Sequence, residues 1–388
     1  MKKIAIICVI IIITFTLFGC FNRKTLVANS QNSVKYWTVG AGGNFATLED
    51  ALASPEVVSG SNILVYNGTY TVNSPITITK SVNIFGQSQS GTIFETAGTS
   101  SDPVAMFNIQ TNNVQLSKLS ILDRKTTNTS VETAIVASNP STTGSLISGV
   151  NINNCTIQMV EFGVFMRAGN WSISNNTFVY NSPLSNTKFY PMGIYAAYGK
   201  CTISGNTLIN QTNYTTPRFI ELTGTSAYQS TENFSGTLTI ENNIAQSGPY
   251  FQFFIQNNWA GTPGGFNLVF EGNSVVGGQS VPSNNFIIFY PGSANNGNLL
   301  GSVTLKNNTL VNNTDANTGG KGIIGIDSAS GTPMAFRSSP LTVYTSGNTV
   351  TNTTLFYSGF EQANGSSNAT VGYNPLTITP VTINQMNN

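Results

Sequence analysis

The amino-acid sequence predicts an all-β protein that winds into a solenoid of stacked, parallel β-strands. A short phrase ending in Asn recurs along much of the chain, and apolar residues alternate with polar ones around it. Self-similarity at intervals of about 20 to 50 residues is typical of repeat architectures, and period-two alternation is typical of half-buried strands. Helical patterns are almost absent, which argues against leucine-rich repeats.

The repeated phrase is an alternating strand that runs into an Asn and leaves it on another apolar residue. Five successive copies place this Asn at positions 176, 206, 243, 273 and 308, at intervals of 30, 37, 30 and 35 residues. Variable intervals favour coils with a similar core and loops of different length over a propeller with rigid blades. The copies are Ile173–Phe178, Ile203–Leu208, Ile240–Asn243, Phe270–Val275 and Leu305–Leu310, with a looser copy at Ser346–Val350 and one at Ile152–Ile157 that has Cys155 in the Asn position.

Asn suits both the turn and the stack. It tolerates left-handed φ better than any residue except Gly, so it can end a strand. If coils stack about 4.8 Å apart, the Asn side chains fall one above another and form a hydrogen-bonded ladder. An all-antiparallel sandwich is the alternative.

A second set of apolar segments recurs roughly midway between the Asn phrases and predicts a second stacked sheet. No interdomain linker is evident, so residues 61–360 are predicted to form one continuous body. The segments are 132–136, 162–167, 192–197, 219–222, 251–255, 285–289 and 321–326.

The first 35 residues differ from the rest of the chain. Two lysines precede a mostly apolar run over residues 4–18, which is short for a membrane span and indicates an export signal. The run ends in Leu-Phe-Gly-Cys, which resembles the lipobox of bacterial lipoproteins. The resemblance implies a signal peptide over 1–19, lipidation of Cys20 and a polar tether over 20–35. We therefore expect an exported, membrane-anchored lipoprotein on the cell surface or the periplasmic face; a plain signal peptide or an uncleaved anchor is the alternative.

Residues 36–60 are predicted to cap the solenoid, because an open end would expose apolar core and unpaired strand edges. A strand leads through a Gly-rich turn into a short helix with Leu48, Ala51 and Leu52 on one face. Strands over 62–70, 76–78 and 82–86 follow. This succession resembles the start of the pectin-lyase-like superfamily of right-handed parallel β-helices. The resemblance implies a single-stranded right-handed parallel β-helix with a short N-terminal capping helix, and residues 361–388 are predicted to form a C-terminal lid or tail.

The composition excludes several classes of function. Charged residues make up 8% of the 388, against roughly 25% in an ordinary soluble protein. The formal net charge is +1, so no basic patch is available for nucleic acid. The absence of His removes Ser-His triads, His-ligated zinc and imidazole acid–base chemistry. We expect no metal and no cofactor.

Two cysteines, Cys155 and Cys201, fall within the predicted solenoid. If Asn176 marks the coil between them, they lie more than about 9 Å apart. A disulfide needs Cα atoms within about 7 Å. Both are therefore predicted to be reduced, buried and structural.

The superfamily contains many enzymes that cut or de-esterify acidic polysaccharides, but their signatures are largely missing. Asn313–Asp315 matches the Asn-Thr-Asp of polygalacturonase-like members, whereas their His is absent and the only adjacent acidic pair, Glu49–Asp50, lies in the cap helix. The phrases of pectin-methylesterase-like members are also absent. The five Asp residues are too scattered to predict the calcium cluster of pectate-lyase-like members.

The second set of segments offers a candidate site. When Gly163 is aligned with Gly193 and with the next coil, one residue of each coil falls in a single outward row. This row consists of Phe165, Tyr195 and Glu221, and Arg167 and Arg218 are predicted to lie close to it. Tyrosines in adjacent turns, Tyr190 and Tyr198, are suited to stacking on sugars. In an enzyme, Arg or Tyr would be the base and Glu221 a binding or acid group. The alternative is an ordinary surface salt bridge among packed aromatics.

Three functions remain open at this point. The first is non-catalytic binding of a polysaccharide, a cell-surface glycan or another surface protein, which the missing signatures favour. The second is a polysaccharide lyase or glycoside hydrolase that uses Arg167, Tyr195, Arg218 and Glu221. The third is a purely structural role in the cell envelope.

Overall fold

The computed structural model describes residues 36–99, 102, 104–125, 133–138, 147–167, 169–181, 192–196, 200–211, 218–223, 236–248, 253–257, 266–277, 287–291, 300–312, 324–326, 342–351 and 382–385. The expected signal peptide, the lipidated Cys20 and the tether lie outside the described residues. Within the described ranges, no helix has the length and apolar character that crossing a membrane requires.

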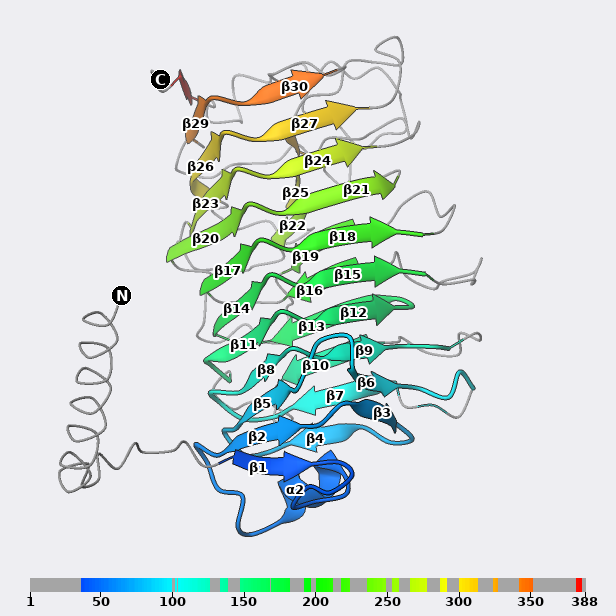
Figure 1. Ribbon diagram of the computed structural model, residues 1–388. Coiled ribbons are helices and arrows are strands. Elements are labelled where there is room, and N and C mark those ends of the chain that lie inside the picture. The colour runs from blue at the N-terminus through cyan, green and yellow to red at the C-terminus, as the bar shows by residue number, and fades with distance from the viewer. Residues whose placement is uncertain are drawn as a thin grey trace, which may run out of the picture. The chain divides into compact units, whose positions relative to one another are not determined.

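The strands form three parallel sheets, shown in Figure 1. Sheet A contains, in spatial order, β1 (Tyr36–Val39), β2 (Asn62–Val65), β5 (Asn83–Gly86), β8 (Gln115–Ser117), β11 (Val150–Asn153), β14 (Asn170–Ser174), β17 (Lys200–Ser204), β20 (Gly236–Glu241), β23 (Phe266–Glu271), β26 (Leu300–Lys306), β29 (Thr342–Ser346) and β31 (Thr382–Gln385). Sheet B contains β3 (Gly68–Thr71), β6 (Thr92–Glu95), β9 (Ser120–Leu122), β12 (Thr156–Met159), β15 (Thr177–Tyr180), β18 (Thr207–Asn210), β21 (Ile244–Gly248), β24 (Ser274–Gly277), β27 (Thr309–Asn312) and β30 (Thr349–Thr351). Sheet C contains β4 (Ile76–Ile78), β7 (Ala105–Ile109), β10 (Thr133–Ser138), β13 (Phe162–Arg167), β16 (Met192–Ala196), β19 (Arg218–Thr223), β22 (Phe253–Asn257), β25 (Ile287–Pro291) and β28 (Ile324–Ile326).

Each coil uses one strand of each sheet, in the order A, B, C. One coil consists of β11, β12 and β13, and its strands pair in parallel with β14, β15 and β16 of the next. In Figure 1, sheets A and B run from left to right on the near side, sheet C returns behind them, and the chain rises toward β30. The winding is therefore right-handed, and the architecture is the right-handed parallel β-helix that the sequence implies.

The structure contains one more sheet than the two sets of segments predicted. The phrase around each Asn is divided between two sheets: Ile173 lies in β14 of sheet A, and Phe178 lies in β15 of sheet B. The segments midway between the phrases form sheet C. Alternation alone does not reveal the division, because apolar residues point inward on both sides of the bend.

The first coil is capped as predicted. Helix α2 (Leu48–Ala53) begins after Thr47, whose side chain accepts a hydrogen bond from the backbone N–H of Asp50 at 3.1 Å, and buries Leu48, Ala51 and Leu52. At the other end, the described part of the expected lid is β31, which pairs with β29 and extends sheet A by one strand.

The predicted Asn ladder is present and regular. The backbone N–H and the Nδ2 of Asn176 both donate to Oδ1 of Asn206, at 3.0 and 3.1 Å, and Nδ2 also donates to the carbonyl oxygen of Ile152 at 2.9 Å. The same three bonds recur from Asn206, Asn243, Asn273 and Asn308. The side chains of residues 176 to 308 in the ladder are almost fully buried, so each amide satisfies backbone groups that water does not reach.

The left-handed residue of the turn is not the ladder Asn, as the sequence suggested, but the residue before it. Positive φ occurs at Asn175 (55°), Gly205 (64°), Asn242 (55°), Gly272 (66°), Asn307 (53°) and Gly347 (62°). Turning and stacking are thus divided between two adjacent residues. From residue 175 onward Asn and Gly alternate in this outer column, and a Cβ added at Gly205, Gly272 or Gly347 would lie 2.2–2.4 Å from Oδ1 of the Asn one coil earlier.

Cys155 and Cys201 are buried and form no disulfide, as predicted. The register of sheet A pairs Cys201 with Trp171, and Trp171 with Val150 in the coil of Cys155, so two coil steps separate the cysteines. Cys155 occupies the ladder position, and its backbone N–H donates to Oδ1 of Asn176 at 2.9 Å. Burial raises the pKa of the Cys155 thiol to about 12 and that of Cys201 well above its usual value, so neither thiol is ionised near neutral pH.

Candidate functional site

The outward row predicted on sheet C exists. Phe165 of β13 pairs with Tyr195 of β16, which in turn pairs with Glu221 of β19. Gly163 leaves room for the core behind this row, since a Cβ there would lie 2.6 Å from the carbonyl oxygen of Gly193 and 2.8 Å from the buried ring of Phe178. The three side chains of the row therefore follow one another at successive coils.

Aromatic rings on this row pack against one another. The rings of Phe165 and Tyr195 are stacked with centroids 5.0 Å apart and planes 9° apart, and Phe162, which sequence reasoning missed, stacks on Tyr195 at 5.3 Å. The Arg167 guanidinium carbon lies 4.7 Å from the centroid of the Phe165 ring, within the range of cation–π attraction. The faces of these aromatic rings are therefore in contact with neighbouring side chains. The aromatic cluster forms a rigid surface, and few of its ring faces are open to a ligand.

Glu221 is the acidic member of the row and is only 5% exposed. The register places Tyr195 on one side of it and Phe254 of β22 on the other. Among the described strands of sheet C, Glu221 is the only acidic residue, and Arg167 and Arg218 are the only basic ones. Burial of a carboxylate is favourable only where polar groups surround it.

The remaining predicted residues are placed only in part. Arg218 opens β19, and its backbone pairs with Met192 in the same sheet, but its side chain is outside the described part of the structure. Tyr190 and Tyr198 lie in ranges that are not described, as does Asn313–Asp315. The structure thus brings Phe165, Arg167, Tyr195 and Glu221 together on one face.

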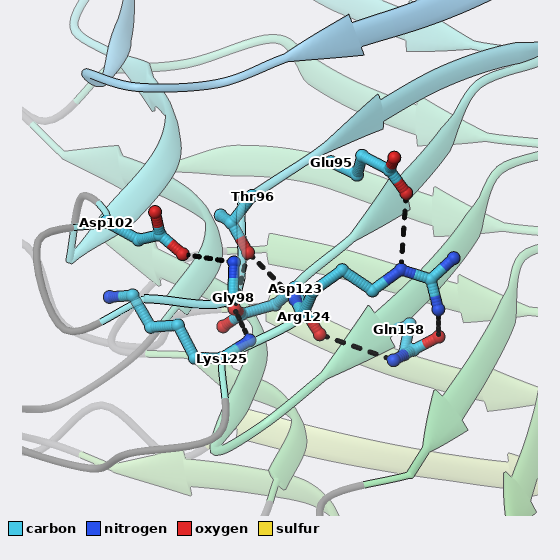
Figure 2. A network of polar contacts seen from close by, with 8 residues as sticks. All are labelled: Glu95, Thr96, Gly98, Asp102, Asp123, Arg124, Lys125 and Gln158. Atoms are coloured by element: carbon cyan, nitrogen blue, oxygen red, sulfur yellow. Dashed lines mark hydrogen bonds and ion pairs between the residues drawn. The ribbon is translucent and has the colours of Figure 1, made fainter.

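A second group of charges, which the sequence did not predict, lies where sheet B leads into sheet C (Figure 2). Asp102, Asp123 and Lys125 are each at most 9% exposed. Oδ1 of Asp123 accepts hydrogen bonds from Oγ1 of Thr96 and from the backbone N–H of Lys125, at 3.3 and 3.2 Å. Burial raises the pKa of the Asp123 carboxyl, and Asp102 raises it further, whereas the hydrogen bonds and the charge of Lys125 lower it.

The acidic groups of this second cluster are satisfied from within the fold. Oδ2 of Asp102 accepts from the backbone N–H groups of Gly98 and Thr99 at 2.7 and 2.8 Å, and Oδ1 accepts from the Thr99 hydroxyl at 3.0 Å. Arg124 joins Glu95 at 3.3 Å and Gln158 at 3.2 Å across adjacent coils (Figure 2). These contacts stabilise the turn between sheets B and C. Asp102 and Asp123 are 21 residues apart in the sequence, and no pattern there indicates that they lie in one cluster.

Neither group of charges has the composition of a metal centre. Within the described ranges, no three Asp, Glu, His or Cys side chains come close enough to hold a metal ion. Two flanking carboxylates, which glycoside hydrolysis usually requires, are likewise absent from the described strands of sheet C. The sheet C row offers one carboxylate, a guanidinium and a phenol, which suit hydrogen bonding to hydroxyl-rich ligands.

No known protein family matches the chain, and no curated protein matches its sequence. Several solved structures are similar. They include the A-module of mannuronan C-5 epimerase AlgE6 from Azotobacter vinelandii (11% identity, 84% of this chain and 87% of that chain, TM-score 0.43) and pectin methylesterase PemA from Erwinia chrysanthemi (12%, 81% and 79%, 0.32). The pectin methylesterase from Aspergillus niger is another (11%, 89% and 89%, 0.35). Superpositions this loose do not bear on activity.

Proposed function

We propose that the protein binds polysaccharide on the outer face of sheet C without cleaving it. The observation that carries the proposal is the continuous row of Phe165, Tyr195 and Glu221, with the Arg167 guanidinium over the Phe165 ring. In a chain with 8% charged residues, this face combines a guanidinium and partly exposed rings with a carboxylate that is almost buried.

The packing explains how such a face would bind. Stacked rings lose little conformational freedom when a ligand arrives, so less entropy opposes binding. The Tyr195 hydroxyl and the Arg167 guanidinium can then hydrogen-bond to sugar hydroxyls, and Glu221, which is 5% exposed, acts on the ligand through its neighbours in the row. Because sheet C repeats with each coil, an extended chain lying along the axis would meet successive members of the row.

The test measures binding and cleavage on the same samples. A glycan array identifies a ligand, and an ultraviolet assay on the bound glycan detects unsaturated products. Glu221→Gln and Arg167→Leu are each expected to weaken binding at least tenfold, about 1.4 kcal/mol or more. Glu241→Gln, on the outer face of sheet A, is the matched control and is expected to bind normally.

The outcomes separate the candidates. Unchanged binding by both sheet C variants would remove this face from the site. Unsaturated products would assign a lyase activity instead, with Tyr195 or Arg167 as base. No binding to any glycan would favour the structural role.

We also propose that Cys20 is lipidated and anchors the exported protein to a membrane. The support is the apolar run closed by Leu-Phe-Gly-Cys. Metabolic labelling with a fatty acid is expected to mark the wild-type protein and to fail with Cys20→Ala. Labelling of the Ala variant would contradict this assignment.

A further inference from the structure

The row on the outer face of sheet C is part of a longer line that follows the axis. The strand register joins one residue from each strand of the sheet, and the line passes through Phe165, Tyr195 and Glu221. Glu221 is the one charged residue among these positions of the described strands. In order along the axis, the line consists of Thr77, Asn108, Val136, Phe165, Tyr195, Glu221, Phe254, Ile288 and Gly325.

Positions two residues further along these strands add one cation to the face. Arg167 pairs with Ser138 one coil earlier, and the equivalent positions of β19, β22 and β25 are Thr223, Gln256 and Tyr290. Strands β22, β25 and β28 contain only uncharged residues. The nine described strands of sheet C therefore carry two basic residues, with Arg218 counted at the start of β19, and one acidic residue.

This distribution of charge disfavours an acidic polysaccharide, which carries charged groups at intervals along its whole length. Arg167 can pair with one of these groups. A group near Glu221 would meet a like charge, which opposes association. A group near the register positions of Phe254 and Ile288 would have uncharged residues of the sheet as its neighbours, and a charge that loses water without gaining a partner weakens binding.

An uncharged sugar chain does not meet these obstacles. Its apolar C–H groups can contact the half-buried rings of Phe165 and Tyr195. Its hydroxyls can hydrogen-bond to the Arg167 guanidinium, which the Phe165 ring already holds at 4.7 Å before a ligand arrives. We infer that the polysaccharide bound on sheet C is uncharged. The inference rests on the proposed function and adds the chemical class of the ligand.

The test compares sugar chains that differ only in charge. Glucan, mannan and galactan oligosaccharides are each titrated onto the full-length protein in neutral form and after oxidation of their primary alcohols to carboxylates. The neutral form of at least one backbone is expected to bind, and its oxidised form is expected to bind at least about tenfold more weakly. The affinity for the neutral form should stay constant between about 0.05 and 0.5 M sodium chloride, because salt screens only charge interactions.

A cation added beside the row tests whether charge is the basis of this selection. Val136 is half-buried and pairs with Phe165 from the preceding coil. Val136→Arg is expected to raise the affinity for the oxidised form, in a manner that salt suppresses, and to change the affinity for the neutral form little. Thr202→Arg is the matched control, since Thr202 is a half-buried outward residue of sheet A, and it should alter neither affinity. Circular dichroism establishes that both variants are folded.

The outcomes distinguish the inference from the proposed function. Tighter binding of the oxidised form by wild type, with an affinity that falls as salt rises, would overturn the inference and leave the proposed function standing. An unchanged affinity for the oxidised form in folded Val136→Arg would also contradict the inference. Failure of both forms of every backbone to bind would overturn the proposed function together with the inference.

Discussion

Replacing Asn243 with Leu is expected to lower the free energy of unfolding by about 4 kcal/mol, the largest effect of any substitution considered for this protein. Asn243 lies in the middle of the ladder and is 1% exposed. Its Oδ1 accepts from the backbone N–H and the Nδ2 of Asn206, and its Nδ2 donates to the Ile203 carbonyl oxygen and to Oδ1 of Asn273.

Leu removes these four bonds while the neighbouring groups stay buried. The backbone N–H of Asn206 is buried and cannot hydrogen-bond to water instead. A buried donor without an acceptor costs about 1–3 kcal/mol. The other lost bonds add about 1 kcal/mol each at most. The loss is local, because each coil of a solenoid contacts only its neighbours.

Two measurements check this prediction. The melting temperature of Asn243→Leu should fall well below that of wild type, and hydrogen exchange should accelerate at the amides of the turns around 206, 243 and 273. Asn348→Leu is the matched control, since Asn348 holds the same ladder position but is partly exposed. Equal losses at the two positions would show that burial of the ladder does not set its contribution.

Replacing Gly205 with Ala is expected to cost about 1–2 kcal/mol, mainly because of the backbone conformation at this position. Gly205 has φ of 64°, and the left-handed conformation costs a residue with a Cβ about 1–2 kcal/mol. The added Cβ would also lie 2.4 Å from Oδ1 of Asn175 in the preceding coil, but the Asn175 side chain is exposed and can rotate away, so this contact adds a smaller cost.

A double-mutant cycle separates the two costs. Asn175→Gly removes the side chain that occupies the space and keeps a residue that tolerates the φ of 55° at position 175. The loss from Gly205→Ala in this background should shrink to the conformational part, with a coupling energy of about 0.5–1 kcal/mol. Full additivity in thermal or chemical denaturation would contradict the interlocking of the outer column.

Much of the fold and part of the candidate site could be predicted from the repeat. The ladder of Asn176 to Asn308 and the row of Phe165, Tyr195 and Glu221 follow from one fact: parallel coils bring equivalent positions together. Helix α2 followed from the spacing of its apolar residues and from the need to cover an open end. The local sequence is sufficient to predict these features, because each copy of the repeat contains the alternating apolar residues and the Asn that define its strand and turn.

The tertiary structure alone decided how side chains share the space between coils. Which residue of each turn takes positive φ, and why Gly follows Asn in the outer column, depends on where Asn175 Oδ1 lies above Gly205. The stacking of Phe162 on Tyr195 depends on how side chains turn between two paired strands, and the electrostatic effect of Asp102 on Asp123 depends on the path of a turn. The sequence by itself determined which residues are neighbours along the axis, whereas side-chain direction, burial and charge interactions were set by packing between coils.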